Sequence, residues 1–252
     1  MLQQNYQSGS IKKALKIVEC VGQSTKQLKA SEVASLTQMK RATAFRILAY
    51  LTSLGYIFKD TSNNLYSVGH KIFGFGDKSD FLKTLTTYSI QHIRNLSKES
   101  QLITYLAVLE GPHIMYCDKV EPGRDSIAPR AFRMRLDAHS CALGKAMLAY
   151  KSYDELREIY KTYSLHKHTK NTIITLDNLY AELRKVRKNG YSINMAETFD
   201  YVYGVGAPIL DAKNKAIAAI SLSGTESTIN VKTIPNLAHK LLISSKLISN
   251  EL

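Results

Sequence analysis

Hydrophobic residues recur at every third or fourth position over the first part of the chain, a spacing that predicts helices. A first helix is predicted over residues 10–22, with a serine able to cap its start and a glycine at its end. Its apolar side chains have helical spacing: Ile11, Ala14, Leu15, Val18 and Val21. ASEVASL, residues 30–36, predicts a short second helix. Residues 38–55 predict a third, ending at Gly55, a residue suited to a left-handed cap.

After Gly55 the pattern becomes strand-like. Two apolar runs, Tyr56 to Phe58 and Leu65 to Val68, flank a polar turn and predict a β-hairpin. Three helices followed by a hairpin are typical of a winged helix-turn-helix. The glycine-rich stretch 69–79 follows. We therefore expect one domain over residues 1–74 and a second over 75–252, with a linker at about 69–80.

The rest of the chain mixes helical and strand-like patterns, which predicts a single α+β domain. A long amphipathic helix is expected over residues 80–100, with Leu82, Leu85, Ile93 and Leu96 at compatible spacing. Strands are expected over 102–110 and 113–120, and helices over 141–150, 153–160 and 176–188. Residues 203–224 predict a second hairpin that turns between Asp211 and Lys215, and a helical tail starts at Thr233.

Positive charge is concentrated in the predicted winged helix. Residues 1–76 carry ten Lys and Arg against three Asp and Glu, a net charge of +7. The other 176 residues carry 24 against 18, a net charge of +6, so the charge density of the first part is nearly three times higher. This asymmetry favours a polyanion as the partner of the N-terminal domain. A charged surface that only maintains solubility is the alternative.

Composition indicates a protein with a substantial core, since 44% of the residues are hydrophobic. No apolar run is long enough to span a membrane and the polar start has no signal-peptide pattern, so we expect a soluble, cytoplasmic protein. The three cysteines form no CxxC pair, which fits reduced thiols. His166 and His168 lie two residues apart in a polar segment, and no helical HxxxH occurs. We therefore expect no metal site and no cofactor.

On a helical wheel, the third helix separates a packed face from an exposed one. The packed face consists of Ala44, Ile47, Leu48 and Leu51. Thr43, Arg46 and Tyr50 lie on the other face, beside the small Ala42 and Ala49. Lys40 and Arg41 fall in the first turn, where positive charge opposes the helix macrodipole. A DNA phosphate or an acceptor-rich base edge nearby would offset that cost.

We therefore expect DNA contacts from the third helix and from the hairpin. The helix would contribute Lys40, Arg41, Thr43, Arg46 and Tyr50, and the hairpin Lys59, Asn63 and Asn64. Arg46 suits guanine or phosphate, and Thr43 suits phosphate or a thymine methyl group. The alternative is an ordinary solvated helix face. Arg46 has a further one, an ion pair with a carboxylate such as Glu32 that ties the helices together.

Several segments resemble the IclR family of bacterial transcription regulators: SIKKALKIVE, TAFRILAYLTSLGYI, LYSVGHKIFGFG, AHSCALGKAMLAY and VGAPILDAKNKAIAAISLSG. The resemblance covers residues 10–245. It implies a GAF-like effector-binding domain after the winged helix, a DNA-binding dimer, and a small organic acid or aromatic compound as effector. The sequence departs from the family at Gln38, Lys40 and Ala42, where Gly, Pro and Ser are usual.

The residues of the second domain also indicate a ligand site. In AISLSG the strand period of two places the hydroxyls of Ser221 and Ser223 on one face. HSCALGK leads into a helix start, where free N–H groups near Cys141, Ala142 and Leu143 can receive a carboxylate. Met134 and Leu136 are expected to form an apolar wall. Serines that hydrogen-bond only within the sheet are the alternative.

The family's polar ligand contacts carry over only in part. The resemblance implies effector contacts at the two serines and at the helix-start amides. A position that is often acidic in the family is Asn194 here, and one that is often cysteine is Gly204. Both changes alter the charge and the size of the pocket.

His139 and Cys141 invite an enzymatic interpretation, as base and nucleophile. They lie two residues apart with only Asp137 as an acidic neighbour, which does not make a catalytic geometry, so we expect no enzyme. We predict a regulator that binds an operator as a homodimer, with pairing of dimers into a tetramer, and whose DNA binding responds to a small metabolite. The alternative is a ligand-binding or enzymatic GAF-like protein whose winged helix mediates protein contacts.

Overall fold

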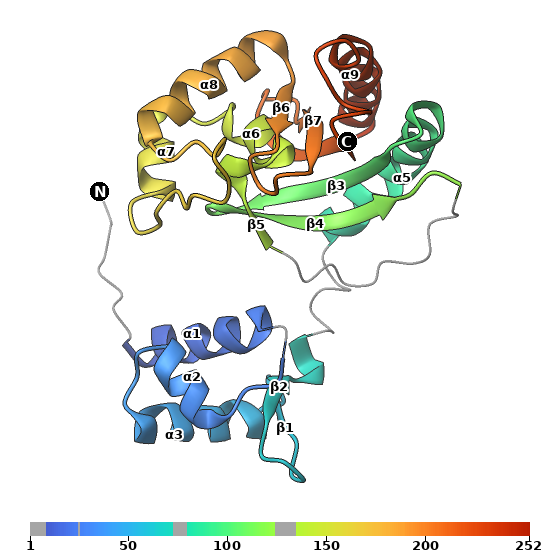
Figure 1. Cartoon of the computed structure of the whole chain (residues 1–252). Coiled ribbons are helices and arrows are strands. Elements are labelled where there is room, and N and C mark those ends of the chain that lie inside the picture. Colours follow the sequence, from blue (N-terminus) through green and yellow to red (C-terminus); the bar gives the residue numbers. More distant parts are fainter. Residues whose placement is uncertain (1–8, 25, 73–79, 124–134) are drawn as a thin grey trace. The chain divides into compact units, whose positions relative to one another are not determined.

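The chain forms two compact units, Met1–Asp80 and Phe81–Leu252, in a computed structural model (Figure 1). The structure describes residues 9–24, 26–72, 80–123 and 135–252. The boundary expected between residues 74 and 75 lies outside the described residues and stays a prediction. No helix among those described is both long and apolar enough to cross a membrane.

The N-terminal unit contains the three helices and the hairpin that the pattern predicts. They are α1 (Gly9–Gln23), α2 (Ala30–Leu36), α3 (Arg41–Ser53), β1 (Ile57–Lys59) and β2 (Tyr66–Val68). The two strands pair antiparallel, and an isolated bridge joins Leu28 to Tyr66. Residues 70–72 are again helical. This arrangement is a winged helix-turn-helix, with β1 and β2 as the wing.

The turn between α2 and α3 shows how the chain sets the angle of the exposed helix. The Met39 N–H donates to the Ala34 carbonyl and the Gln38 N–H to that of Ser35, which is the Schellman pattern of a helix end. This pattern needs a left-handed residue, and Gln38 has φ +56°. Gly55 fills the same position after α3, with φ +78°. The glycine usual at position 38 in the family would adopt this conformation at lower cost.

The core of the N-terminal unit is built from one face of each helix. On α3, Ala44, Leu48 and Leu51 are buried, as the wheel predicts. On α1, the buried residues are Ile17 and Val21, whereas Ile11 and Leu15 are exposed. Ala14 and Val18 also pack against this core, so three of the five predicted apolar positions face it, whereas the predicted spacing missed Ile17.

The C-terminal unit is built on one six-stranded antiparallel sheet with the order β5-β4-β3-β8-β7-β6. The strands are β3 (Ile103–Glu110), β4 (His113–Val120), β5 (Arg135–Asp137), β6 (Ser192–Met195), β7 (Tyr203–Leu210) and β8 (Ala216–Gly224). The helices are α5 (Asp80–Ser100), α6 (Ala142–Leu148), α7 (Tyr153–Ile159), α8 (Leu176–Asn189) and α9 (Ile234–Glu251), and η1 (Ala138–Ser140) is a 3₁₀ turn. The α+β prediction is confirmed. The pattern had not predicted β5, β6 or η1.

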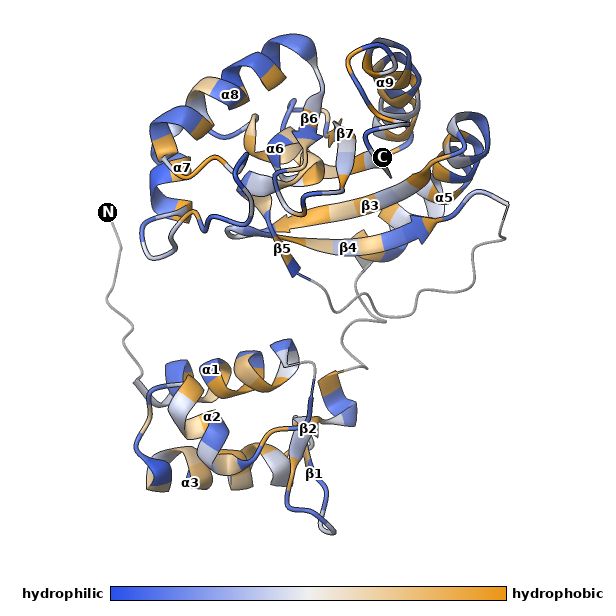
Figure 2. Ribbon diagram, viewed as in Figure 1, coloured by the Kyte–Doolittle hydropathy of each residue, from blue (hydrophilic) through white to orange (hydrophobic). Residues whose placement is uncertain are grey.

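Helices cover both faces of the sheet. On one face, α5 and α9 pack against alternate strand residues such as Leu106, Ile220 and Leu222. On the other, α6, α7 and α8 pack against Ala107 and Ala219, the intervening positions. Figure 2 shows the matching hydropathy: β3 and β4 carry hydrophobic stretches, whereas α8 is hydrophilic over most of its visible length. Since successive strand residues alternate, Ser221 and Ser223 face the α6 side.

Candidate functional site

The exposed face of α3 carries most of the residues predicted to bind DNA. Lys40, Arg41, Arg46 and Tyr50 are exposed, and Thr43 is half-buried. Lys40 immediately precedes the helix and makes no side-chain cap to it. The small Ala42 and Ala49 are exposed on the same side. The exposed face of α3 therefore combines basic side chains with two alanines, at which another molecule can approach the helix backbone closely.

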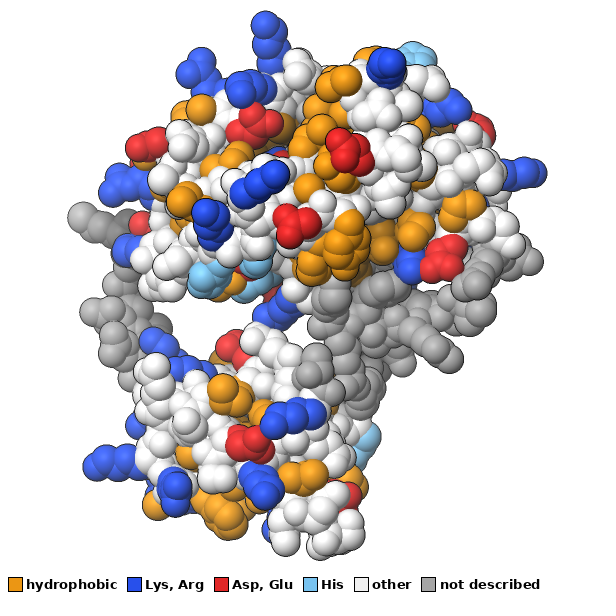
Figure 3. Space-filling view, viewed as in Figure 1, with side chains coloured by type: hydrophobic (Ala, Val, Ile, Leu, Met, Phe, Trp, Pro, Cys, Tyr) orange, Lys and Arg blue, Asp and Glu red, His pale blue; other side chains and the backbone are white. Residues whose placement is uncertain are grey.

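The charges on this face have no carboxylate partner within the described part of the chain. None of the ion pairs found there includes Lys40, Arg41 or Arg46. Glu32, the suggested partner of Arg46, instead accepts the Lys29 N–H at 2.7 Å and pairs with Lys26 at 2.9 Å. The structural alternative for Arg46 is therefore wrong. Figure 3 shows basic side chains spread over the visible face of this unit.

The wing places the remaining predicted DNA contacts at and beside its turn. Asn63 and Asn64 are exposed, and Lys59 is half-buried with its Nζ 5.9 Å from the Tyr66 ring centroid. The Asn63 side chain also shapes the turn, because its Oδ1 accepts the Leu65 N–H at 2.9 Å. Hydrogen bonds from Ser62 lower the pKa of Asp60, so the wing also carries one carboxylate that stays ionised.

One residue of the α3 face was missed by the wheel. Phe45 is 56% exposed and lies one turn from both Ala42 and Ala49. It shares the surface with Arg46, where an aromatic side chain can contact a thymine methyl group or a sugar. The sequence did indicate this residue, because the helical wheel places Phe45 on the same exposed side as Ala42 and Ala49.

In the C-terminal unit, a cavity of about 130 Å³ lies between the sheet and the start of α6. Eight of the nine residues predicted to bind effector line it: Leu136, Cys141, Ala142, Leu143, Asn194, Gly204, Ser221 and Ser223. The ninth, Met134, lies outside the described residues. The lining also includes residues that the sequence did not indicate: Tyr105, Tyr116, Thr198, Phe199, Val202 and Leu222.

The sheet register explains why these distant residues meet. Asn194 on β6 lies opposite Gly204 on β7, which lies opposite Ser223 on β8. In the neighbouring row, Ser221 lies between Gly206 and Tyr105. A Cβ atom on Gly206 would lie 2.7 Å from the Ala142 carbonyl oxygen, closer than real contacts allow. The glycine therefore lets α6 approach the sheet at the edge of the cavity.

Polar donors that have no partner among the described residues face this space. Neither the Ser221 nor the Ser223 hydroxyl hydrogen-bonds to another described residue. The alternative of serines bonded within the sheet is therefore not favoured. Asn194 is buried, and its Oδ1 accepts the Glu197 N–H at 2.8 Å, which fixes the side chain and leaves its NH₂ group as a donor.

Two aromatic rings and a buried thiol complete the wall. The Tyr105 and Tyr116 rings pack with their centroids 5.0 Å apart. Burial raises the pKa of both phenols, most strongly that of Tyr116, so both keep their protons. Cys141 precedes α6, and its Sγ accepts the Gly144 N–H at 3.4 Å. The cavity thus combines an apolar wall with neutral hydrogen-bond donors.

A buried ion pair supports the same region. Lys145 on α6 is 1% exposed, and its Nζ lies 2.5 and 2.7 Å from the two carboxylate oxygens of Glu197. Glu197 follows β6 and is itself held by the Asn194 side chain. The pair therefore ties α6 to the segment that follows β6, the strand that carries Asn194.

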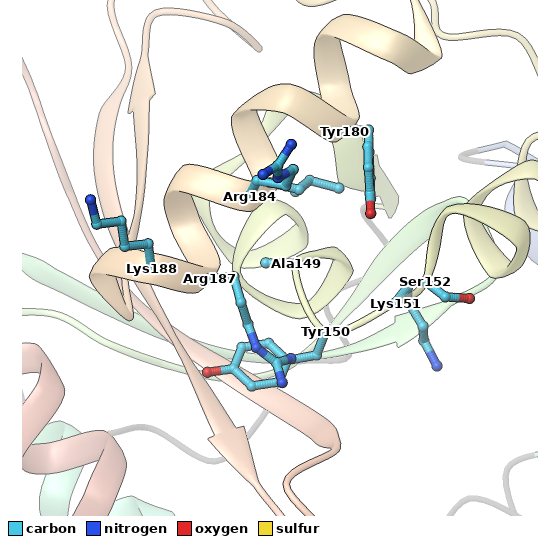
Figure 4. Close-up of a pocket in the computed structure, with 9 residues that line it drawn as sticks. Ala149, Tyr150, Lys151, Ser152, Tyr180, Arg184, Arg187 and Lys188 are labelled. Carbon is cyan, nitrogen blue, oxygen red and sulfur yellow. The ribbon is translucent and has the colours of Figure 1, made fainter.

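A second cavity, of about 460 Å³, is basic and lies between α8 and the end of α6 (Figure 4). Lys151, Arg184, Arg187 and Lys188 line it, and the Arg187 guanidinium stacks 3.8 Å above the Tyr150 ring. No residue predicted from the sequence lies there. Its arginines and Lys188 are exposed, so solvent screens their charge. The smaller cavity, with its buried polar groups, is therefore the better-formed site.

The geometry does not support His139 and Cys141 as a catalytic pair. Burial raises the pKa of the Cys141 thiol to about 12, which removes the thiolate at neutral pH. The His139 Nε2 atom lies 3.1 Å from the His166 carbonyl oxygen, and no hydrogen bond joins His139 to Cys141 within the described residues.

Comparison with known families decides the relationship of this chain. A sequence profile for the IclR helix-turn-helix domain matches residues 10–61, and one for the C-terminal domain of the bacterial transcriptional regulator IclR matches residues 83–250. The chain belongs to the IclR family. This IclR-family protein is a DNA-binding transcription regulator, as the resemblance of its motifs predicted.

Individual relatives agree with this assignment. The HTH-type transcriptional regulator XynR of Escherichia coli (strain K12) is 25% identical over 92% of each chain. The crystal structure of an IclR transcriptional regulator from Alicyclobacillus acidocaldarius is similar, with a TM-score of 0.78 and 20% sequence identity. The match covers 98% of the present chain and 99% of the Alicyclobacillus chain. An IclR homologue from Microbacterium hydrocarbonoxydans, solved with 4-hydroxybenzoate, is 17% identical with a TM-score of 0.75, over 96% and 98% of the two chains.

Proposed function

We propose that the regulator reads its operator with the exposed face of α3 and the wing, and that a small carboxylate in the sheet cavity changes its affinity for DNA. The observation that carries the DNA-reading assignment is the group of exposed cations on α3, none of them paired with a described carboxylate. Unpaired cations at a helix start are unfavourable unless an anion binds. The DNA phosphate backbone supplies that anion. The small residues Ala42 and Ala49 let α3 come close to the base edges in the major groove.

The roles of the α3 residues follow from their positions. Lys40 and Arg41 in the first turn are placed for phosphates, and Arg46, one turn further on, for a guanine edge. Lys59, Asn63 and Asn64 of the wing contact the neighbouring part of the DNA backbone. Two copies on a roughly palindromic operator match the half-site geometry of such domains, so we propose a homodimer, with a tetramer as a dimer of dimers. We place the protein in the cytoplasm, where its DNA is.

Binding to DNA upstream of the regulator's own gene tests this interface. We expect the logarithm of the binding constant, measured by fluorescence anisotropy, to fall linearly with the logarithm of salt concentration. Arg46→Ala should reduce operator affinity about 5- to 150-fold, which corresponds to about 1–3 kcal/mol. Lys16→Ala, an exposed cation on α1, serves as the matched control and should change affinity far less. Salt-independent binding would contradict the proposed phosphate contacts. Equal effects of the two variants would exclude Arg46 from the DNA interface.

The ligand class follows from the size and chemistry of the cavity. A cavity of about 150 Å³ holds benzene, so 130 Å³ limits the occupant to a molecule of about that size. Neutral donors from Asn194, Ser221 and Ser223 suit carboxylate or hydroxyl oxygens, and the Tyr105 and Tyr116 rings suit a short carbon skeleton. We therefore propose a small monocarboxylate, while a ring-bearing acid as large as 4-hydroxybenzoate would require the cavity to widen.

Thermal shift with a series of monocarboxylates of increasing length tests this class. A ligand at 100 times its Kd adds about 2.7 kcal/mol of stability, which raises Tm by roughly 5–10 °C in a domain of this size. Combined Ser221→Ala and Ser223→Ala should abolish the shift without changing DNA affinity in the absence of ligand. Ser164→Ala, an exposed serine outside the cavity, is the control. An unchanged shift in the double variant would place the ligand elsewhere.

We propose no catalytic activity for this chain. A buried Cys141 thiol with a pKa of about 12 and no hydrogen bond to His139 lacks the thiolate that nucleophilic catalysis requires. The alternative, a GAF-like enzyme whose winged helix binds protein, would show turnover of the ligand that stabilises it. Incubation of the protein with that ligand, followed by mass spectrometry of the small molecule, should return the ligand unchanged.

A further inference from the structure

Several histidines gather around one carboxylate at the end of β5. The Oδ2 atom of Asp137 lies 2.9 Å from Nε2 of His168 and 3.5 Å from Nδ1 of His166. Its Oδ1 atom lies 3.4 Å from Nε2 of His113. These residues come from β4, β5 and the segment before α8, so the fold, not the local sequence, brings them together. Histidine side chains are visible as a group on one face of the C-terminal unit (Figure 3).

His139 adds a buried nitrogen that has no partner. The side chain is fully buried, and its Nε2 lies 3.1 Å from the His166 carbonyl oxygen. Since a carbonyl oxygen only accepts, Nε2 carries the hydrogen and Nδ1 keeps a free lone pair. Among the described residues, Nδ1 has no hydrogen-bond partner. A buried polar atom left unsatisfied costs about 1–3 kcal/mol, so this nitrogen indicates a ligand.

We propose that Asp137, His139 and His168 bind a divalent transition-metal ion of the Zn²⁺ class. Each offers one ligand atom, and these atoms lie within 4.8 Å of one another. A tetrahedral Zn²⁺ ion with bonds of about 2.0–2.1 Å needs ligand atoms ~3.3 Å apart. The 2.9 Å between Oδ2 of Asp137 and Nε2 of His168 is close to this value, and no two of the ligand atoms are more than 4.8 Å apart, so side-chain rotations bring the three within bonding distance of one ion.

The donor set selects the kind of ion. Two imidazole nitrogens and one carboxylate oxygen suit Zn²⁺ and its neighbours in the first transition row, whereas Mg²⁺ and Ca²⁺ prefer oxygen ligands throughout. His166, which is exposed, or a water molecule is available as the fourth ligand. His166 and His168 both reach solvent, so an ion has a path to the buried Asp137 and His139.

Asp137 and His139 are already held in their metal-binding forms, whereas the Nε2 of His168, which donates to Asp137 at 2.9 Å, gives up that hydrogen when an ion binds. The Tyr163 hydroxyl donates to Oδ1 of Asp137 at 2.6 Å, and the His166 carbonyl fixes the His139 tautomer, which are typical outer contacts of metal ligands.

The proposal departs from the sequence prediction that no metal site exists, and it does not depend on the effector proposal. That prediction rested on the absence of a local ligand motif, but here the ligands are separated by up to 31 positions. Leu136 and Cys141 flank the site in the chain and both line the effector cavity. A bound ion would therefore fix the segment that forms one wall of that cavity.

Titration of the chelator-treated full-length protein with Zn²⁺, followed by calorimetry, tests the site. We expect one ion per chain, and a Co²⁺ titration should give the intense visible absorption of a tetrahedral site. His168→Gln should weaken Zn²⁺ binding at least 10- to 100-fold and remove the Co²⁺ band. His239→Gln, an exposed histidine on α9, is the matched control and should leave both unchanged.

Two results would overturn the assignment. One is a wild-type protein that takes up no stoichiometric Zn²⁺, which would leave the cluster as a hydrogen-bonded structural element. The other is a His168→Gln variant that binds as tightly as the wild type, which would place the ion elsewhere. Because His168 is exposed, this variant should fold; the buried Asp137→Asn is a second variant, accepted only if circular dichroism shows a native spectrum.

Discussion

The buried pair between Lys145 and Glu197 allows a quantitative test of the C-terminal unit. Lys145→Met keeps an unbranched side chain of similar length but removes the charge, and so leaves the Glu197 carboxylate buried without its cation. Glu197 is itself only 6% exposed. Removing one partner of such a pair is far more costly than removing both, because the remaining charge has lost its compensation.

The size of the effect follows from the two options left to Glu197. It can stay ionised in the interior, which typically costs about 3–5 kcal/mol, or it can take up a proton. From its ordinary pKa of 4.5, proton uptake at pH 7 spans 2.5 pH units at about 1.36 kcal/mol each, about 3.4 kcal/mol. We expect a loss of about 3–4 kcal/mol at pH 7, which lowers Tm by roughly 6–16 °C.

The same reasoning fixes the pH dependence. Burial raises the folded-state pKa of Glu197 in the wild type although Lys145 opposes it; without Lys145 this pKa rises further above the unfolded value, so the deficit of the variant is small below about pH 4.5 and grows as pH rises. At pH 5.5, one pH unit above 4.5, the deficit should shrink to at most about 1.4 kcal/mol, because the wild type bears part of the same cost. Differential scanning calorimetry of the full chain at both pH values measures it.

Glu197→Gln in the Lys145→Met background is the control, because it removes the stranded carboxylate. The double variant should recover part of the stability lost at pH 7. Its deficit relative to the wild type should change less between pH 5.5 and 7 than that of the single variant. A single variant within about 1 kcal/mol of the wild type at pH 7, or a loss that does not change with pH, would refute the reasoning.

Three further predictions concern the backbone and the thiols. Gln38→Gly should stabilise the N-terminal unit by about 0.5–1 kcal/mol, because relief of a left-handed residue (about 1–2 kcal/mol) exceeds the added entropy of unfolded glycine; an unchanged or lower Tm of that unit would contradict it. Gly144→Ala should destabilise the C-terminal unit by about 1–3 kcal/mol, measured as a lower urea midpoint, because its Cβ would lie 2.1 Å from the Ala138 carbonyl oxygen. Cys141 should resist iodoacetamide at pH 8 in the folded protein, because a pKa of about 12 leaves a thiolate fraction of about 10⁻⁴. Labelling of Cys141 should rise when the protein is unfolded. Rapid labelling of the native protein would show that the thiol is neither buried nor protonated.

Elements with strong local patterns could be predicted from the sequence. The helix expected over residues 80–100 has the bounds of α5, because its apolar positions repeat over about four turns. Ser221 and Ser223 share a face because the strand period alone dictates it. By contrast, β5 and β6 have three and four residues, too few for a period to show. Neighbouring strands recruit them as the two edges of the sheet, which is a long-range effect.

The candidate sites divide in the same way. The α3 face could be predicted from a wheel, because one helix carries all its residues. For the effector cavity, the strand period indicated the two serines and the helix start indicated residues 141–143, whereas Asn194 and Gly204 came only from the resemblance, since neither carries a local sign of lining a cavity. The Asp137 cluster could not be predicted, because His113, His139 and His168 meet only after β4, β5 and the segment before α8 have packed.

The pairing of β3 with β8 has a consequence for the order of folding during synthesis. The winged helix is complete once β2 has emerged at Val68, and its contacts are local. The sheet of the C-terminal unit joins Ile103 to Ser223, so β3 lacks its central neighbour until β8 has left the ribosome. A nascent or truncated chain that ends before β8 would therefore carry a folded DNA reader without a sensor. Such a fragment would compete for the operator but could not respond to the metabolite.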